Sequence, residues 1–235
     1  NGTGGVNTNT INSIISNLGL MDIDAALAIT NTSRTFDTTN GTIDILAGKT
    51  LTVNNGTTQF GAGTTLGGSG TLDLLGTHVL ELNSDYTYTN PILSLSGSTT
   101  IDGPGKFINQ TTLTLHNETL NADIDNQGTL FVGGLSNTTT INGNLTTAAG
   151  SEIELQAVAG QGATTLNIAN GFTNNGLLKL NGSRSGNNTT LNVLSGSLTN
   201  SATGTIQAVT NGTGGVNTNT INSIISNLGL MDIDA

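Results

Sequence analysis

Apolar and polar residues alternate with a period of two along most of this chain. Leu, Ile or Val occupies every second position in segments such as 41–45 (GTIDI), 70–74 (GTLDL) and 176–180 (GLLKL). Alternation of this kind predicts short β-strands that bury one face and expose the other. Gly and Asn are frequent between these segments, and both tolerate the left-handed conformations of tight turns. The pattern therefore predicts an all-β protein of many short strands.

The predicted strands recur in a fixed order. A strand that opens with Gly is followed by a Thr-rich strand, as at 111–115, 164–168 and 189–193, and then by a shorter third element, as at 171–175 (GFTNN). Three strands per round with inward aliphatic residues predict a right-handed parallel β-helix, a β-solenoid in which each round stacks on the last. An antiparallel β-sandwich is the alternative, because its strands are similarly spaced. The ordered three-part motif favours the solenoid.

Period-two alternation also predicts which side chains are buried. The intervening Thr50, Asp73 and Thr165 should face outward, and a slip of one residue would exchange the two faces. The leucines expected inside are Leu51, Leu72, Leu113, Leu130, Leu166, Leu178 and Leu191.

One segment near the start departs from the period of two. Four aliphatic residues there are spaced i, i+3, i+4 and i+7, which predicts a two-turn α-helix near residues 11–18. So short a helix is marginal alone, so its apolar stripe should pack at a junction between repeats. The residues expected at this junction are Ile11, Ile14, Ile15 and Leu18.

The first 25 residues return letter for letter at 211–235. The offset of 210 residues (211 minus 1) predicts that 1–210 form one complete tandem unit and that 211–235 begin an identical unit. The cadence of Gly residues gives about eight rounds per unit, with 70–104 as one long round. We expect neighbouring identical units to stack end to end, with lateral contacts between fibres as a further expectation.

Composition excludes several classes of partner. The net charge is −10, with only five basic residues, so nucleic acid would be repelled. No apolar run approaches the roughly 18 residues of a membrane span, so we expect no membrane insertion. Cys is absent, which removes disulfides and thiolate chemistry. An exported rod stabilised by its backbone ladder is compatible with this composition.

The acidic residues do not form a recognisable catalytic or metal site. A glycosidase or lyase needs carboxylates that converge on one face, but here two acids merely share a strand. Segment 123–128 (DIDNQG) copies the start of an EF-hand loop, yet Gly134 stands where the bidentate Glu is needed. We therefore expect no catalytic residue, no metal and no cofactor. The acidic pairs are Glu152 with Glu154, Asp123 with Asp125, and Asp22 with Asp24.

Several other polar residues are interpreted as surface features. His78 and His116 have no evident partner and should lie on exposed faces of Thr-rich strands. Tyr86 and Tyr88 should form a local cap over the long round. Asn-x-Ser/Thr sequons are candidates for N-glycosylation if the source uses that modification. Besides Asn1 and Asn211, these are Asn31, Asn40, Asn55, Asn109, Asn117, Asn137, Asn144, Asn181, Asn187 and Asn188.

Rounds such as 128–150 (GTLFVGGLSNTTTINGNLTTAAG) carry a resemblance to a known family. Most of 41–209 resembles the passenger regions of bacterial filamentous-haemagglutinin-like adhesins and autotransporters. The resemblance implies an extracellular, cell-surface fibre, often an adhesin that contacts a glycan or another cell. We therefore expect a structural repeat of a fibre or giant adhesin, not an enzyme. The alternatives are a carbohydrate-processing β-helix enzyme and a self-assembling filament subunit made of separate chains.

Overall fold

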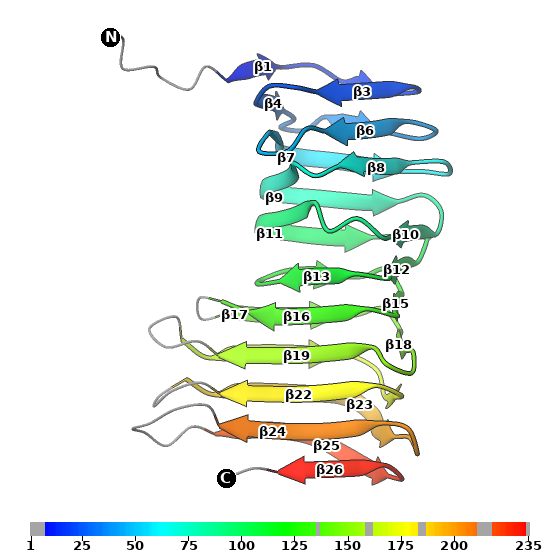
Figure 1. The fold of residues 1–235 in the computed structure, drawn as a ribbon, viewed down its shortest axis with the longest axis vertical. Coiled ribbons are helices and arrows are strands. Elements are labelled where there is room, and N and C mark those ends of the chain that lie inside the picture. The colour runs from blue at the N-terminus through cyan, green and yellow to red at the C-terminus, as the bar shows by residue number, and fades with distance from the viewer. Residues whose placement is uncertain (1–7, 135–136, 158–161, 183–186, 211–217, 234–235) are drawn as a thin grey trace.

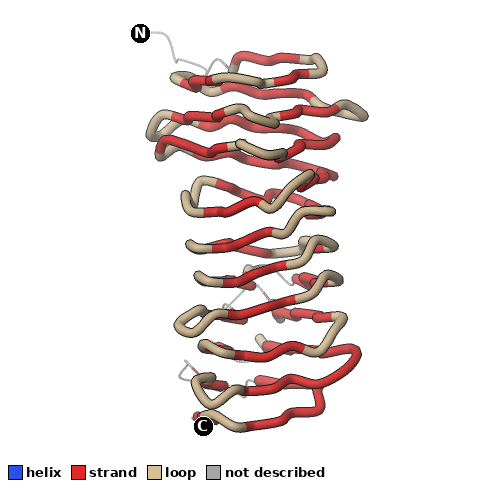
Figure 2. Tube along the Cα trace, turned by 90° about the vertical axis from the view of Figure 1, so that its right-hand side faces the viewer, coloured by secondary structure: helices blue, strands red, loops and turns tan. Residues whose placement is uncertain are grey.

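The computed structural model describes residues 8–134, 137–157, 162–182, 187–210 and 218–233. Each described strand pair is parallel, and the coils stack into one elongated β-solenoid (Figures 1 and 2). In Figure 1 the front strands run leftward and the back strands rightward while the chain descends, which makes the solenoid right-handed. The predicted all-β parallel helix is confirmed.

In the N-terminal part, each coil gives two segments to a large sheet and one strand to a small sheet. The small sheet contains β3 (Leu20–Ile23), β6 (Thr42–Ile45) and β8 (Thr65–Gly68). The large sheet contains β1 (Asn9–Ile11), β2 (Ile15–Ser16), β4 (Leu27–Thr30), β5 (Thr35–Asp37), β7 (Thr50–Phe60), β9 (Thr71–Leu82) and β11 (Leu93–Asp102).

In the C-terminal part the coils form three stacks of strands. The large sheet continues through β14 (Thr119–Leu120), β17 (Asn137–Ile141), β20 (Thr164–Ile168), β21 (Phe172–Asn174), β23 (Thr189–Asn200) and β25 (Asn219–Asn227). A second stack contains β10 (Tyr86–Tyr88), β12 (Phe107–Asn109), β15 (Ile124–Asn126) and β18 (Leu145–Thr147). The third contains β13 (Thr112–Leu115), β16 (Thr129–Gly133), β19 (Glu152–Ala157), β22 (Leu177–Gly182), β24 (Thr205–Thr210) and β26 (Leu230–Ile233).

One ladder of paired residues crosses both parts of the solenoid. Nine residues from successive coils lie in register along it, and only Thr58 among them is polar. Successive members of such a ladder are about 4.8 Å apart, so each side chain packs on the one above and the one below. The members are Ile15, Phe36, Thr58, Leu80, Ile101, Leu120, Ile141, Ile168 and Val193.

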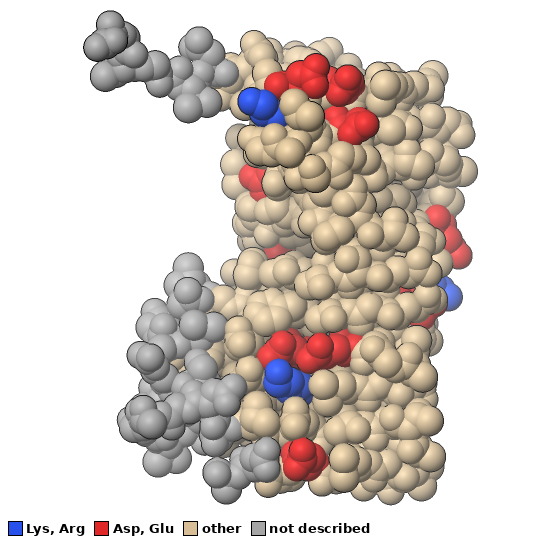
Figure 3. Space-filling model, in the orientation of Figure 1, with Lys and Arg blue, Asp and Glu red and all other residues tan. Residues whose placement is uncertain are grey.

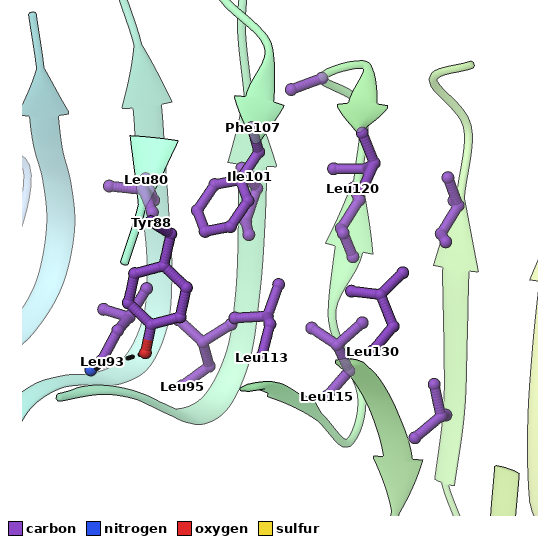
Figure 4. Packing of buried hydrophobic residues seen from close by; sticks show 14 of the residues in the cluster. Leu80, Tyr88, Leu93, Leu95, Ile101, Phe107, Leu113, Leu115, Leu120 and Leu130 are labelled. Atoms are coloured by element: carbon purple, nitrogen blue, oxygen red, sulfur yellow. Dashed lines mark hydrogen bonds between the residues drawn. The ribbon is translucent and has the colours of Figure 1, made fainter. Parts of the chain in front are cut away.

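The interior is filled by the aliphatic residues that alternation selects. All seven leucines predicted to be inside have no exposed surface, which confirms the register of the strands. Thr50, Asp73 and Thr165 alternate with them and are only partly covered. Near the middle of the stack, aromatic rings join this core, and Tyr88 accepts a hydrogen bond from the Leu93 N–H at 3.1 Å (Figure 4).

Glycine allows the chain to turn a corner inside the long strands. Gly56, Gly76 and Gly97 occur at this corner in three successive coils with φ of 74°, 81° and 119°. Only glycine adopts such angles without steric cost. A Cβ on Gly97 would also clash with the Gly76 backbone directly above it. The corner therefore requires glycine in each of these three coils.

The helix predicted near residues 11–18 does not form. The segment contains β1 and β2 instead, and the described residues contain no helix. The odd-numbered Ile11 and Ile15 are partly buried while the even-numbered Ile14 and Leu18 are exposed. Pairing with β4 and β5 supplies hydrogen bonds to the backbone of β1 and β2. An isolated two-turn helix is only marginally stable, so the strand pairing is preferred.

Across the described residues the stack has about nine turns, whereas the sequence cadence predicted about eight rounds for the 210-residue unit alone. Segment 70–104, predicted to be one long round, contains parts of two coils. Strands β9 and β11 pair along almost their whole length, with Leu72 opposite Leu93. The coil here is therefore shorter than the predicted long round, because the pairing register sets its length and the spacing of Gly residues does not.

Truncating an inward-facing side chain should destabilise the solenoid far more than truncating an outward-facing one from the same strand. Leu72→Ala should lower the free energy of unfolding by about 2 to 5 kcal/mol because it leaves a cavity. Leu75→Ala, at a side chain 37% exposed, should cost under about 1 kcal/mol. Urea unfolding monitored by circular dichroism compares them, and equal costs would contradict the assigned register.

Candidate functional site

The repeated 25-residue sequence forms the first and last described coils of the solenoid (Figure 1). Residues 9–23 supply β1, β2 and β3 in the first copy, and residues 219–233 supply β25 and β26 in the second. Ile15, its copy Ile225, and Ile221 pack against the core. The two ends are therefore built from one sequence, whose first part forms two short strands in the first copy and one continuous strand in the second.

The two copies pair through opposite edges. In the first copy, β1, β2 and β3 pair with β4, β5 and β6 of the following coil. In the second copy, β25 and β26 pair with β23 and β24 of the preceding coil. Among the described residues, neither copy has a ladder partner on its other edge. The repeated sequence thus pairs through its downstream edge in the first copy and through its upstream edge in the second.

Burial of one inward isoleucine reports this difference directly. Ile23 is 4% exposed because the coil below covers it, whereas its copy Ile233 is 61% exposed. Both side chains point inward, from β3 and β26, which have the same sequence but lie in different sheets of the solenoid. Ile233 is a core residue whose covering coil is supplied only in the first copy.

An asparagine at the next corner has its hydrogen-bond partners divided in the same way. Asn17 donates from Nδ2 to the Thr42 carbonyl in the coil below, at 3.1 Å. Its copy Asn227 accepts a hydrogen bond from Asn200 Nδ2 in the coil above, at 2.8 Å. Asn200, which has a coil on each side, is linked in both directions: Asn174 donates to it and it donates to the Leu230 carbonyl.

A second asparagine repeats the division on the outer surface. Asn12 accepts a hydrogen bond from the Arg34 guanidinium of the following coil. Its copy Asn222 donates to Asn192 Oδ1 of the preceding coil, at 2.7 Å. The two partners occupy opposite sides of the coil, so both contacts can exist at once in one residue.

One glycine of the repeated sequence is sterically required in the second copy but not in the first. A Cβ on Gly229 would clash with the carbonyl oxygens of Gly204 and Ser201 in the preceding coil. The same atom on Gly19 would have nothing within 4 Å. The first copy therefore carries a glycine that its own surroundings do not require, but that a preceding coil would.

The two copies do not lie on the same ladders. The ladder that starts at Ile15 reaches Val193, whereas its copy Ile225 pairs with Leu198, beyond a register shift in β23. Ile225 is thus one corner further around the coil than Ile15. One 210-residue step along the sequence is therefore not a whole number of ladder steps.

A line of polar side chains runs inside the otherwise apolar interior. His78 pairs with Thr99, and Glu118 follows beside Thr99 in the next coil. All three are almost completely buried, so the prediction that His78 is exposed is wrong. The sequence did indicate this burial: His78, Leu80 and Leu82 are alternate residues of one strand, so their side chains point to the same face.

These buried polar groups are incompletely paired within the described part of the chain. His78 Nε2 lies 3.0 Å from Thr58 Oγ1, but His78 Nδ1, Thr99 Oγ1 and Glu118 Oε1 have no protein partner there. Burial lowers the pKa of His78 to about 4 because the imidazolium would lose hydration. Burial also raises the pKa of Glu118, against the hydrogen bond from the His116 N–H.

A groove of about 570 Å³ lies where the two parts of the solenoid meet. Residues Leu93–Ser96 pair only with β9 and β13 pairs only with β16, so the sheet is interrupted there. Its lining is Leu93, Ser94, Leu95, Ser96, Gly97, Thr114, His116, Asn117 and Gly134. No carboxylate is among these lining residues.

The acidic pairs from the sequence are separate surface features. Glu154 forms an ion pair with Lys179 at 3.0 Å, and Asp125 accepts hydrogen bonds from Gln127 and Thr146 at a corner. The view in Figure 3 shows acidic side chains in small separate groups on a mostly uncharged face. Within the described ranges, no three His, Asp or Glu side chains are close enough to hold a metal ion together.

The two tyrosines are core residues of the middle coils. Tyr86 packs between Phe60 and Phe107, with ring centroids 4.7 and 6.0 Å away, and Tyr88 lies 5.6 Å from Phe107. Burial raises the pKa of Tyr88 to about 12. They fill the interior at the place where a surface cap was expected.

The sequons differ in accessibility. Asn31 and Asn109 are buried and donate to carbonyls of the next coil, so the folded solenoid does not present them to a modifying enzyme. Asn181 and Asn187 are also buried. Asn55 is partly covered, and the Asn137 side chain lies outside the described part. Those that face solvent are Asn40, Asn117, Asn144 and Asn188.

Comparison with protein-family models, with curated proteins and with solved structures found no match to this chain. The part of the chain that the structure describes has no helix of the length and hydropathy required to cross a bilayer.

Acidification should destabilise the solenoid through His78. Its pKa in the folded chain is below the unfolded value, so its stabilising contribution is complete above pH 6.5 and is lost as pH falls toward 4. Between pH 7 and pH 4, the unfolding free energy of His78→Gln should gain about 3 kcal/mol relative to wild type. A constant difference across this range would show that His78 does not stay neutral.

Glu118 should have the opposite dependence. Its pKa is raised, so its contribution is favourable at low pH and is lost as pH rises through the folded value. Glu118→Gln should therefore be more stable than wild type at pH 8, with the gain shrinking toward pH 4. Glu154→Gln, at the partly exposed ion pair, is the control and should show no such gain. Urea midpoints at both pH values test this, and a pH-independent effect would contradict it.

Proposed function

We propose that this chain is a structural repeat of an extracellular fibre or giant surface adhesin, in which one solenoid unit continues directly into the next. The observation that carries the proposal is the division of contacts between the two copies of the 25-residue sequence. The first copy has its downstream partners and the second copy has its upstream partners. A copy between two units would have both.

Continuous stacking also removes the energetic cost of open ends. An uncovered coil leaves unpaired backbone N–H and C=O groups on a strand edge, which invites association. Covering Ile233 to the extent seen for Ile23 would remove an exposed aliphatic side chain from water, a gain of about 1.5 to 3 kcal/mol for full burial. The second copy exposes these groups, and the coil that follows the first copy shows how the next unit would cover them.

Composition and resemblance support a role outside the cell. The chain lacks Cys and is rich in Thr, Asn and Gly. Its rounds resemble those of filamentous-haemagglutinin-like adhesins and autotransporter passengers. The proposed role is mechanical: a stiff backbone ladder holds surface residues at a distance from the cell. A surface glycan or a neighbouring cell is the partner that this role would require.

An enzymatic role receives less support. Hydrolysis of a glycosidic bond normally uses two carboxylates on either side of that bond. The described lining of the groove supplies Ser, Thr, Asn and one His, but no Asp or Glu. We therefore prefer a structural role to carbohydrate processing.

The second candidate is a filament of separate chains. In such a filament the second copy of one chain would stack on the first copy of the next, a pairing different from those that the two copies make within this chain. Denaturing electrophoresis of the native fibre separates the candidates, because a covalent array runs as one very long polypeptide and a stacked filament as short chains.

Gly19 gives a direct test of continuation between units. In a polypeptide of two units, Gly19→Ala in the first unit should be neutral or slightly stabilising, since the added Cβ meets nothing. The same substitution at the internal copy should cost roughly 1 to 3 kcal/mol, because it would meet the preceding coil as at Gly229. Urea unfolding and hydrogen exchange at the unit boundary measure both.

The first-unit substitution is the matched control in the same molecule. If the internal copy tolerates alanine as well as the first copy does, the units are not stacked and the proposal fails. Electron micrographs of the two-unit polypeptide should show one straight rod, about twice as long as one unit.

A further inference from the structure

The groove between β11 and β13 is a place where the stack leaves strand edges open in the middle of the rod. Its upper wall is the first half of β11, residues 93–96, whose only ladder partner among the described strands is β9. Its lower wall is β13, which pairs there only with β16. Figure 1 shows this break between the two parts of the solenoid. Stacking of further units at the ends cannot cover it.

Two rows of backbone groups face each other across the groove. In a parallel ladder, alternate residues direct their N–H and C=O to the same neighbouring strand. The Ile92 carbonyl accepts a hydrogen bond from the coil above, so Leu95, three residues later, directs its groups down into the groove. The Thr111 carbonyl accepts from the coil below, so Thr114 directs its groups up. Both rows need partners from water or from a ligand.

The groove also reaches the apolar core. Leu93 and Leu95 point inward beside Tyr88 (Figure 4) and are 9% and 5% exposed. Leu72 and Leu74, their ladder partners in the coil above, have no exposed surface. The difference arises because no paired strand covers the two leucines from below. The groove therefore combines hydrogen-bonding walls with a small apolar floor.

The other lining side chains are polar but uncharged, since no Lys, Arg, Asp or Glu is among the described lining residues. His116 Nδ1 contacts the Gly133 carbonyl, which can only accept, so this nitrogen carries the proton. In the neutral ring Nε2 is then an acceptor. The lining thus supplies both donors and acceptors without a net charge. These polar side chains are Ser94, Ser96, Thr114, His116 and Asn117.

We propose that this groove binds a neutral oligosaccharide. Each sugar hydroxyl both donates and accepts, so a sugar can serve the N–H and the C=O groups of both walls, while its C–H groups pack on Leu93 and Leu95. The volume of 570 Å³ lies within the roughly 300 to 1,000 Å³ of ligand pockets. The inference rests on the proposed function, because it names the chemical class of the partner of the fibre.

An extended peptide is the alternative ligand, because open strand edges accept added strands. A strand inserted between two others requires them to be about 9.6 Å apart, twice the usual spacing. Cα atoms of β11 and β13 approach within 8 Å of one another. The walls are therefore too close for a strand to pair with both, whereas sugar hydroxyls can reach groups on either wall.

The repeat array would make a weak site effective. The groove is open on one side, so part of the ligand stays in water and a single unit should bind weakly. Each unit of the array carries one groove, and linked grooves that meet a surface bearing many copies of one glycan act together. Such avidity can exceed the affinity of one site by about 100-fold or more.

A printed array of neutral, sialylated and sulfated oligosaccharides tests the proposal, with the biotinylated 235-residue chain displayed in several copies on streptavidin. Binding to at least one neutral oligosaccharide is expected. Ser96→Trp, which fills the groove, should abolish that binding. Ser98→Trp is the matched control and should retain it, because Ser98 is exposed on the same strand but outside the lining.

A second pair of variants avoids a large side chain. Thr114→Val removes one hydroxyl from the lining and should weaken binding of the selected oligosaccharide roughly 3- to 10-fold, as expected for one lost hydrogen bond. Thr112→Val, two residues earlier on the exposed face of β13 and outside the lining, should leave it unchanged. Circular dichroism of all four variants checks that the solenoid is intact.

Several results would overturn the proposal: no binding to any neutral glycan, binding to charged glycans alone, or binding that neither Ser96→Trp nor Thr114→Val reduces. Groove-dependent binding of an octapeptide of alternating threonine and valine, with no glycan bound, would assign the groove to peptides instead. The 235-residue chain contains one complete groove, so this test does not require stacked units. Units that fail to stack would reject the array and leave the glycan result unchanged.

Discussion

The parallel backbone ladder between successive coils is the interaction on which this structure depends. A coil of about three short strands cannot satisfy its own backbone N–H and C=O groups, so each must pair with the coil above and the coil below. Side-chain packing follows from that pairing, because residues in register form the apolar columns of the interior. The ladder from Ile15 to Val193 is the longest of these columns.

The ladder also explains which polar residues can be buried. Asparagines at a corner, such as Asn174 and Asn200, link three coils through side-chain and backbone hydrogen bonds and so recover the cost of burial. His78, Thr99 and Glu118 occupy an equally buried line but leave one polar atom each without a protein partner. The interior thus contains both a satisfied and an unsatisfied polar column, and only the second should respond to pH.

An identical sequence at both ends provides an internal comparison that most proteins lack. Differences between Ile23 and Ile233, or between Gly19 and Gly229, reflect their positions in the stack, since the residues and their sequence neighbours are shared. Similarities, as for Ile14 and Ile224, identify what no neighbouring coil covers. This comparison separates the axial contacts of a unit from its lateral ones.

The sequence by itself determined the strand period, the buried leucines and the solenoid class, because alternation is local and repeats many times. Alternation alone places the His78 side chain on the inner face, because His78 is two residues before the buried Leu80. Tertiary structure decided what local patterns leave ambiguous. Ile11, Ile14, Ile15 and Leu18 fit a helical stripe and also an alternating strand, and pairing with the next coil selected the strand. The division of 70–104 between two coils, and the displacement of Ile225 from the ladder of Ile15, follow from long-range register. Register depends on contacts some 20 or more residues apart, which periodicity within a single strand does not encode.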